Sequence, residues 1–281
     1  MKNRDVFLVT TSIKKTFPIK EKKILLAGEW CKDDVNEFFL NKYQFQTLPY
    51  HWDDEKKRSK DSLYLKKIYY KLESDLSLYF NKVHETNFSR KYWSIIISPW
   101  LSRFIISVFD KYSVIKKVKK EFKVKNTKII NFTNYNETVP QNIEEANYYF
   151  QSHHWNHKIF ALLIKKLLLH SKILEVKKKF VVDLPKVQND KNSFKQKFIR
   201  FYCYISNFLR SNNESFVINT YLGFFGEVLL NLKLNNNFKI NLPFEFNRKF
   251  KIDKNLRQKK LKINIKDDEF TKVLKEIIPQ N

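Results

Sequence analysis

The sequence predicts an α/β fold with a mainly parallel sheet, because short apolar runs alternate along the chain with longer segments of helical periodicity. The composition is that of a folded protein with a sizeable core, since 43% of the 281 residues are hydrophobic and 16% are aromatic. No internal repeat or low-complexity block interrupts the alternation. Strands that are joined by helices pair in parallel, because each crossover returns the chain to the same end of the sheet.

The first two elements are predicted to be strands. "DVFLVTT" at residues 5–11 is β-branched and apolar, and "KKILLAGE" at residues 22–29 is a second short apolar run. A loop that contains Pro18 separates them. Short continuous apolar runs of this kind are typical of strands that are buried on both faces of a parallel sheet.

Two long helices are predicted next. Over residues 61–83, apolar residues recur at three- and four-residue steps and form one stripe. The segment at residues 92–109, "YWSIIISPWLSRFIISVF", has a broad apolar face, in which Pro99 predicts a kink or a break. This segment is only marginally long enough to cross a membrane, and it contains Arg103. A buried helix is therefore favoured, with shallow membrane contact as the alternative.

The remaining segments continue the alternation of strands and helices. Ser152 is placed to cap the helix that follows it. We expect strands at residues 127–132 and 215–220, a polar loop over residues 134–152, and helices at residues 155–174, 193–210 and 268–278.

The formal charge of +25 would ordinarily suggest an anionic partner such as nucleic acid. Here most basic residues are lysines, and the abundant Lys, Asn, Ile, Phe and Tyr all have A- and T-rich codons. A base-biased genome produces this composition without selection for DNA binding, so a solvated lysine surface is favoured over a nucleic-acid face. Cys31 and Cys203 are too few for a disulfide framework, and the N-terminus lacks a signal peptide, so a cytoplasmic location is expected.

Several common motifs for cofactors and catalysis are missing. Three glycines, Gly28, Gly223 and Gly226, cannot supply a dinucleotide-binding fingerprint or a P-loop, and no G-x-S-x-G segment occurs. The acidic pairs are adjacent rather than spaced D-x-D, the spacing that holds a nucleotide's divalent cation. His153 and His157 lie one helical turn apart, but no third ligand has metal-site spacing. We therefore expect no metal site and no bound cofactor.

The segment "LPYHWDD" at residues 48–54 is the strongest candidate for a functional loop. A strand-to-helix loop is where parallel sheets place ligand sites. His51 beside Asp53 and Asp54 could act as a general base whose imidazole is oriented by a carboxylate, and Trp52 could stack on a sugar or a base. Alternatively, one of the aspartates simply caps the helix that follows. The residues alone leave both interpretations open.

A series of short motifs resembles one protein family. "FLVTT", "ILLAGEWC", "LPYHWDD", "YWSIIISPWL", "WNH" and "NTYL" occur in this order over nearly the whole chain. They resemble a transferase family from bacterial surface-polysaccharide gene clusters, whose members look like two-domain glycosyltransferases of the GT-B type. The resemblance implies a Rossmann-like N-terminal domain with a large helical component over residues 1–281. It also implies sugar transfer from a nucleotide sugar to a glycan or lipid-linked acceptor, in the cytoplasm or at the inner face of the membrane.

The resemblance also implies which residues form the site. His51 is the candidate base for an acceptor hydroxyl, with Asp53 or Asp54 orienting it. In GT-B enzymes the C-terminal domain holds most of the donor nucleotide, whereas the N-terminal domain shapes the acceptor side. The candidates for substrate binding are Gly28, Glu29, Trp30, Trp52, Trp155, Asn156, His157, Asn219, Thr220 and Tyr221.

Members of this family continue beyond the equivalent of "KEIIPQN", so we expect the C-terminal nucleotide-binding domain to be missing from this chain. One alternative is therefore a half-enzyme that pairs with a separate C-terminal domain. A second is a non-catalytic module that binds nucleic acid or a partner protein through lysine charge and aromatic stacking. A strongly salt-dependent affinity for oligonucleotides would favour that second alternative.

Overall fold

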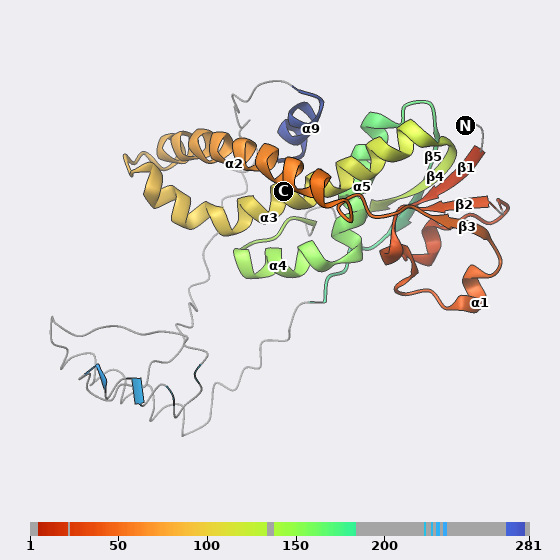
Figure 1. Cartoon of the computed structure of the whole chain (residues 1–281), viewed down its shortest axis with the longest axis horizontal. Helices are drawn as coiled ribbons and strands as arrows, with labels where there is room; N and C mark the ends of the chain where they lie inside the picture. Colours follow the sequence, from red (N-terminus) through yellow and green to blue (C-terminus); the bar gives the residue numbers. More distant parts are fainter. Residues whose placement is uncertain are drawn as a thin grey trace. The chain divides into compact units, whose positions relative to one another are not determined.

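A computed structural model describes residues 5–21, 23–133, 138–183 and 268–278, together with a few single positions between 222 and 234 (Figure 1). The chain divides into two compact units, one formed by Met1–Leu184 with Ile252–Asn281 and the other by Pro185–Lys251. All the helices and strands described below belong to the first unit.

The centre of the fold is a sheet of five parallel strands in the order β3-β2-β1-β4-β5. This arrangement confirms the predicted α/β, Rossmann-like fold. Because β1 pairs with β2 on one side and with β4 on the other, the chain reverses its direction across the sheet at β1. The strands are β1 Asp5–Val9, β2 Lys23–Leu26, β3 Gln44–Thr47, β4 Lys123–Phe132 and β5 Lys172–Lys178.

Helices form the connections between the strands. Figure 1 shows α2 (Glu55–His84) and α3 (Arg90–Glu121) side by side as a long hairpin that extends away from the sheet. Both α3 and α5 pack against β4. The shorter helices are the 3₁₀ helices η1 (Lys14–Thr16) and η2 (Glu29–Lys32), together with α1 (Glu37–Leu40), α4 (Ile143–Gln151), α5 (His153–Leu167) and α9 (Glu269–Ile277).

The α2–α3 hairpin follows from capping and from its apolar stripes. The side chain of Asp54 caps α2 by accepting a hydrogen bond from the backbone N–H of Lys57 (3.0 Å). α3 continues through Pro99 without a break. The hydroxyl of Ser98 lies 2.5 Å from that of Tyr69 on α2, so this side of α3 faces α2 closely.

The structure corrects three expectations about local structure. Residues 143–151 form α4 within the expected loop, because Asn142 caps a short helix in which only Ala146 and Tyr149 are buried. The helix expected over residues 155–174 ends at Leu167, and residues 172–174 open β5. β3 was not expected, since this edge strand is largely exposed and has no apolar run.

Part of the predicted structure falls outside the described residues. The helix expected at residues 193–210 and the strand expected at residues 215–220 both lie there. So do the candidate substrate-binding residues Asn219, Thr220 and Tyr221.

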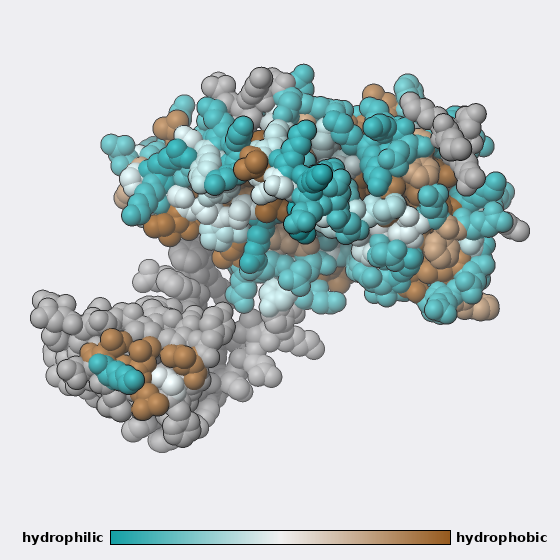
Figure 2. All heavy atoms as spheres, viewed as in Figure 1, coloured by the Kyte–Doolittle hydropathy of each residue, from teal (hydrophilic) through white to brown (hydrophobic). Residues whose placement is uncertain are grey.

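α3 is the one helix in the described ranges that is long and apolar enough to cross a membrane, by length and composition alone. A core helix of a globular domain passes the same test, and twelve residues of α3 are buried in the domain. Other apolar side chains of the hairpin, such as Leu78, Ile95 and Ile96, are exposed. Figure 2 shows apolar side chains among polar ones over this part of the viewed face.

A buried histidine joins β1 to β4 where β1 ends. Nε2 of His157, on α5, accepts a hydrogen bond from the backbone N–H of Ile130 on β4 (3.0 Å). Its Nδ1 lies 3.1 Å from the hydroxyl oxygen of Thr10, the residue after β1. The neutral ring therefore carries its proton on Nδ1 and donates it to Thr10. Thr127 is the last β4 residue that pairs with β1, and Ile130 lies beyond it. The imidazole therefore accepts a hydrogen bond from an N–H group of β4 that the pairing with β1 leaves without a partner.

This arrangement predicts acid sensitivity. Burial, and then the charge of His154, lowers the pKa of His157 from 6.5 to about 3, so the unfolded chain binds the proton more readily than the folded one. The stability that the neutral ring contributes is fully present above pH 6.5 and is lost as the pH falls toward 3. Each pH unit in this window should cost up to about 1.4 kcal/mol for this group.

We expect His157→Gln to be less stable than the native protein at pH 7 but to lose stability less steeply between pH 6.5 and 4.5. Urea unfolding at a series of pH values measures both effects. His170→Gln, at an exposed position, is the matched control and should keep the native slope. An unchanged slope in His157→Gln would contradict the buried neutral ring.

Candidate active site

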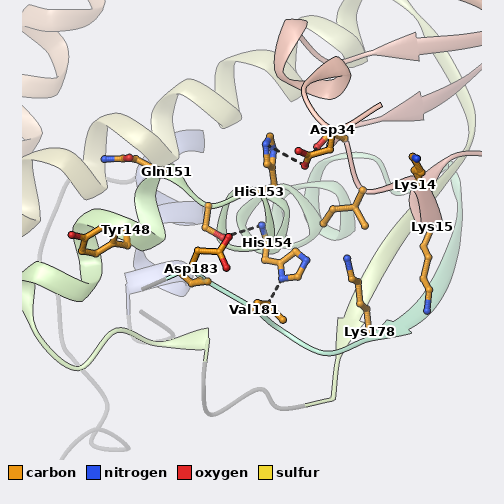
Figure 3. A pocket seen from close by; sticks show the side chains of 14 residues that line it. Lys14, Lys15, Asp34, Tyr148, Gln151, His153, His154, Lys178, Val181 and Asp183 are labelled. Atoms are coloured by element: carbon orange, nitrogen blue, oxygen red, sulfur yellow. Dashed lines mark hydrogen bonds and ion pairs between the residues drawn. The ribbon is translucent and has the colours of Figure 1, made fainter. Parts of the chain in front are cut away.

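The first candidate site is a crevice beside the carboxyl ends of β1 and β5. It has a volume of about 700 Å³ and is walled by residues 12–15 after β1, by the end of α4 and the start of α5, and by the chain from Lys178 to Asp183. We call it the switch-point crevice, because it lies where the chain reverses direction across the sheet. In parallel α/β sheets this is the position at which ligands bind. Figure 3 shows its side chains.

Basic side chains are prominent in the switch-point crevice. Lys14, Lys15 and Lys178 line it together with two carboxylates, Asp34 and Asp183. Asp34 is engaged within the protein, since its carboxylate accepts a hydrogen bond from Ser12 (2.9 Å) and lies 3.7 Å from Nε2 of His153. Burial, followed by the charge of Lys15, lowers the pKa of Lys178.

His154 is held with one nitrogen turned into the crevice. Its Nδ1 accepts a hydrogen bond from the backbone N–H of Val181 (2.7 Å), so the neutral ring carries its proton on Nε2. Burial, and then the charge of Lys178, lowers the pKa of His154 to about 4, which keeps the ring neutral at pH 7. Figure 3 shows the second ring nitrogen turned toward Lys178.

The expected "WNH" residues lie beneath the switch-point crevice rather than on its wall. Ser152 caps α5 as predicted, by accepting from the N–H groups of His154 and Trp155 (3.2 and 3.5 Å). Trp155 is 1% exposed, and the side-chain amide of Asn156 donates to the carbonyls of Phe150 and Ser152. Together with the bridging His157, these residues position the wall, and their assignment to substrate binding stays a prediction.

The "GEWC" residues pack between the end of β1 and α5. The indole of Trp30 donates to the carbonyl of Thr10 (3.2 Å) and stacks on Phe160, and its ring lies where a Cβ on Gly28 would be. Glu29 is exposed and forms a salt bridge with Lys32 (2.6 Å). Burial raises the pKa of the Cys31 thiol to about 12, so this thiol stays protonated and unreactive.

The second candidate site is the His51 cleft, a cavity of about 690 Å³. It is walled by Tyr50 and His51 of the "LPYHWDD" loop, by the start of α2, by the C-terminal half of α3 and by the start of α9. The loop connects β3 to α2, and the structure places it in the wall of a cavity.

The carboxylate that holds His51 belongs to Asp110 on α3. Nε2 of His51 lies 3.0 Å from Oδ1 of Asp110, whereas Asp54 caps α2 and Asp53 is exposed. The expected orienting role of Asp53 or Asp54 is therefore corrected, because a side chain that caps a helix is directed at backbone N–H groups. Burial, and then the charge of Asp110, raises the pKa of the Tyr50 phenol.

The other ring nitrogen of His51 has no hydrogen-bond partner among the described residues. A carboxylate only accepts, so Nε2 must carry the proton that it donates to Asp110, which leaves Nδ1 as an acceptor in the neutral ring. This Nδ1 is buried and receives no hydrogen bond. A buried acceptor without a donor typically costs about 1–3 kcal/mol, and such groups in folded proteins call for a functional explanation.

Trp52 faces a different hollow from its neighbour His51. Its indole donates to the carboxylate of Asp61 (3.0 Å) and stacks on Phe109 (ring centroids 6.3 Å apart). It lines an apolar hollow of about 450 Å³ together with Tyr69, Ile106 and other residues of α2 and α3.

Sequence reasoning missed Asp110 and the lysines and His154 of the crevice. Asp110 lies 59 positions from its partner His51, so no local spacing indicates the pair. No local spacing indicates the contacts of His153 either, whose Nε2 lies 3.5 Å from the carboxylate of Asp33 and 3.7 Å from that of Asp34. In the described residues, no group of three or more His, Cys, Asp or Glu side chains is arranged to hold a metal ion.

Comparison with known proteins gives one match. No curated protein and no solved structure matches the chain significantly. A family model described as the LIC12162 family transferase matches residues 6–281, which include all the described strands and helices apart from Asp5, the first residue of β1. The predicted resemblance to a transferase family is thereby confirmed, and the chain belongs to the LIC12162 family of transferases.

Proposed function

We propose that this transferase moves a glycosyl group from a nucleotide sugar to a hydroxyl of a glycan or lipid-linked acceptor in surface-polysaccharide assembly. The family match supports group transfer, and the Rossmann-like sheet is a scaffold on which such reactions occur. The single observation that carries the proposal is the His51–Asp110 pair, because His51 lines a cavity and its buried Nδ1 has no hydrogen-bond partner among the described residues.

Glycosyl transfer needs a base near the acceptor oxygen, because a neutral hydroxyl is a poor nucleophile. In the proposed reaction the acceptor O–H gives its proton to Nδ1 of His51. The acceptor oxygen then forms a bond to the anomeric carbon, and the bond from that carbon to the donor phosphate breaks. The nucleoside diphosphate leaves with the electron pair of the broken bond.

Asp110 has two roles in this proposal. It fixes the ring orientation and keeps the proton on Nε2, so that Nδ1 remains the acceptor. Its negative charge also stabilises the imidazolium that forms when Nδ1 takes up the proton. Asp110 is thus a positioning residue that acts through His51.

The apolar hollow beside Trp52 suits a sugar ring of the acceptor. Aromatic faces bind the C–H faces of sugars, and Arg58 and Ser62 at the same hollow offer donors for hydroxyl groups. The exposed apolar residues of the α2–α3 hairpin are consistent with work at the inner face of a membrane, where lipid-linked acceptors are found.

We expect His51→Ala to lower kcat about 10²- to 10⁴-fold, the usual contribution of a general base. Asp110→Asn should lower kcat less, because the amide still contacts the ring but no longer stabilises its charge. Release of nucleoside diphosphate from a panel of nucleotide sugars, with membrane extract as the source of acceptor, measures turnover.

Asp53→Asn is the matched control, because Asp53 is an exposed neighbour of His51 that does not line the His51 cleft. It should keep native turnover. Native turnover in His51→Ala would remove this residue as the base, and the lack of acceptor-dependent release from every donor would contradict glycosyl transfer.

We expect Trp52→Ala to raise the acceptor KM about tenfold or more while kcat changes less, because a lost stacking contact typically costs about 1–3 kcal/mol. Trp52→Phe keeps an aromatic face and should retain most of the affinity. Steady-state kinetics with increasing acceptor separates KM from kcat. A native acceptor KM in Trp52→Ala would contradict the role of this hollow.

A further inference from the structure

We propose that the switch-point crevice binds a phosphate group of the substrate between Lys178, Lys15 and the Nε2–H group of His154. The inference deepens the proposed function by naming the chemistry of a second substrate contact. It rests on the proposed function for the identity of the substrate, but the binding itself does not require turnover.

The first argument is that donors converge in the crevice, and that no protein acceptor for them is found among the described residues. His154 is 8% exposed, and the hydrogen bond from Val181 fixes its Nε2 as a donor. Figure 3 shows this nitrogen turned toward the ammonium group of Lys178. Two donors that face the same space repel each other unless an acceptor with negative charge lies between them.

The second argument is the state of the lysines. No salt bridge of Lys14, Lys15 or Lys178 is found within the described ranges. Burial and then the positive charge of Lys15 lower the pKa of Lys178. The negative charge of Asp34 raises this pKa, but by less. An ammonium group placed beside another without a direct counter-ion is stabilised when an anion binds.

The third argument is the direction of α5. This helix of 15 residues begins at the crevice wall with Ser152 as its cap, so the positive end of its dipole faces the crevice. The opposing charges are the carboxylates of Asp34 and Asp183. Ser12 and His153 already engage Asp34, which lessens its repulsion of an incoming anion.

A phosphate fits these donors better than a single carboxylate would. Its several charged oxygens can accept from two ammonium groups and an imidazole N–H at the same time. A cavity of about 700 Å³ also leaves room for the group to which the phosphate is attached. The phosphate could come from the diphosphate of the donor or from a phosphate on the acceptor, since both present the same oxygens.

Calorimetric titration of the full chain with inorganic pyrophosphate tests the inference. We expect Lys178→Met and His154→Phe each to weaken binding about tenfold or more, as expected for a lost charge-assisted hydrogen bond. Lys178→Arg keeps the charge and should retain affinity within a few-fold. Lys172→Met is the matched control, because Lys172 is an exposed lysine at the opposite end of the same strand, and it should bind as the native chain does.

If Lys172→Met and Lys178→Met weakened binding equally, the attraction would be non-specific and the proposal would be overturned. The lack of any binding at millimolar pyrophosphate would also overturn it. Thermal unfolding of each variant shows whether a loss of binding reflects a loss of fold. Titration with nucleoside diphosphates and with glycosyl phosphates then distinguishes a donor from an acceptor source. His51→Ala should bind pyrophosphate normally, so failure of the base and failure of this site give different results.

Discussion

The hydrogen bonds of His157 are the interaction on which the rest of the structure depends. The imidazole takes the backbone N–H of Ile130 and donates to Thr10 at the place where β1 ends and β4 continues. A buried N–H without a partner would cost more than most single contacts contribute. By satisfying it, His157 keeps the two strands together at the reversal point and sets the position of the start of α5.

The position of α5 then separates one structural histidine from two histidines that line the switch-point crevice. His157 is fully buried, whereas His153 and His154, one turn earlier, line the switch-point crevice. The helix start therefore places buried hydrogen bonds and a ligand-accessible surface within five residues of sequence. The His51 cleft is built differently, because its histidine lies in a loop and is held by Asp110 from the α2–α3 hairpin.

The sequence predicted the elements whose signals are local. β1, β2, the two hairpin helices, α9 and the Ser152 cap follow from apolar runs, helical periodicity and capping residues. The exposed edge strand β3 and the turn before β5 lack such signals; the latter contains neither Gly nor Pro. The site was harder to predict, because the partners of His51 and His157 lie far along the chain, and Asp54, adjacent to His51 in sequence, is used as a helix cap.

The most direct test of the account is a long-range ¹H–¹⁵N NMR spectrum of the histidine rings in the full chain at pH 7. The account predicts two neutral rings of opposite tautomer, with the proton on Nδ1 in His157 and on Nε2 in His154. His157→Gln and His154→Phe assign the two sets of signals. Rings that average between tautomers, or that are charged at pH 7, would contradict both the junction between β1 and β4 and the donor turned into the crevice.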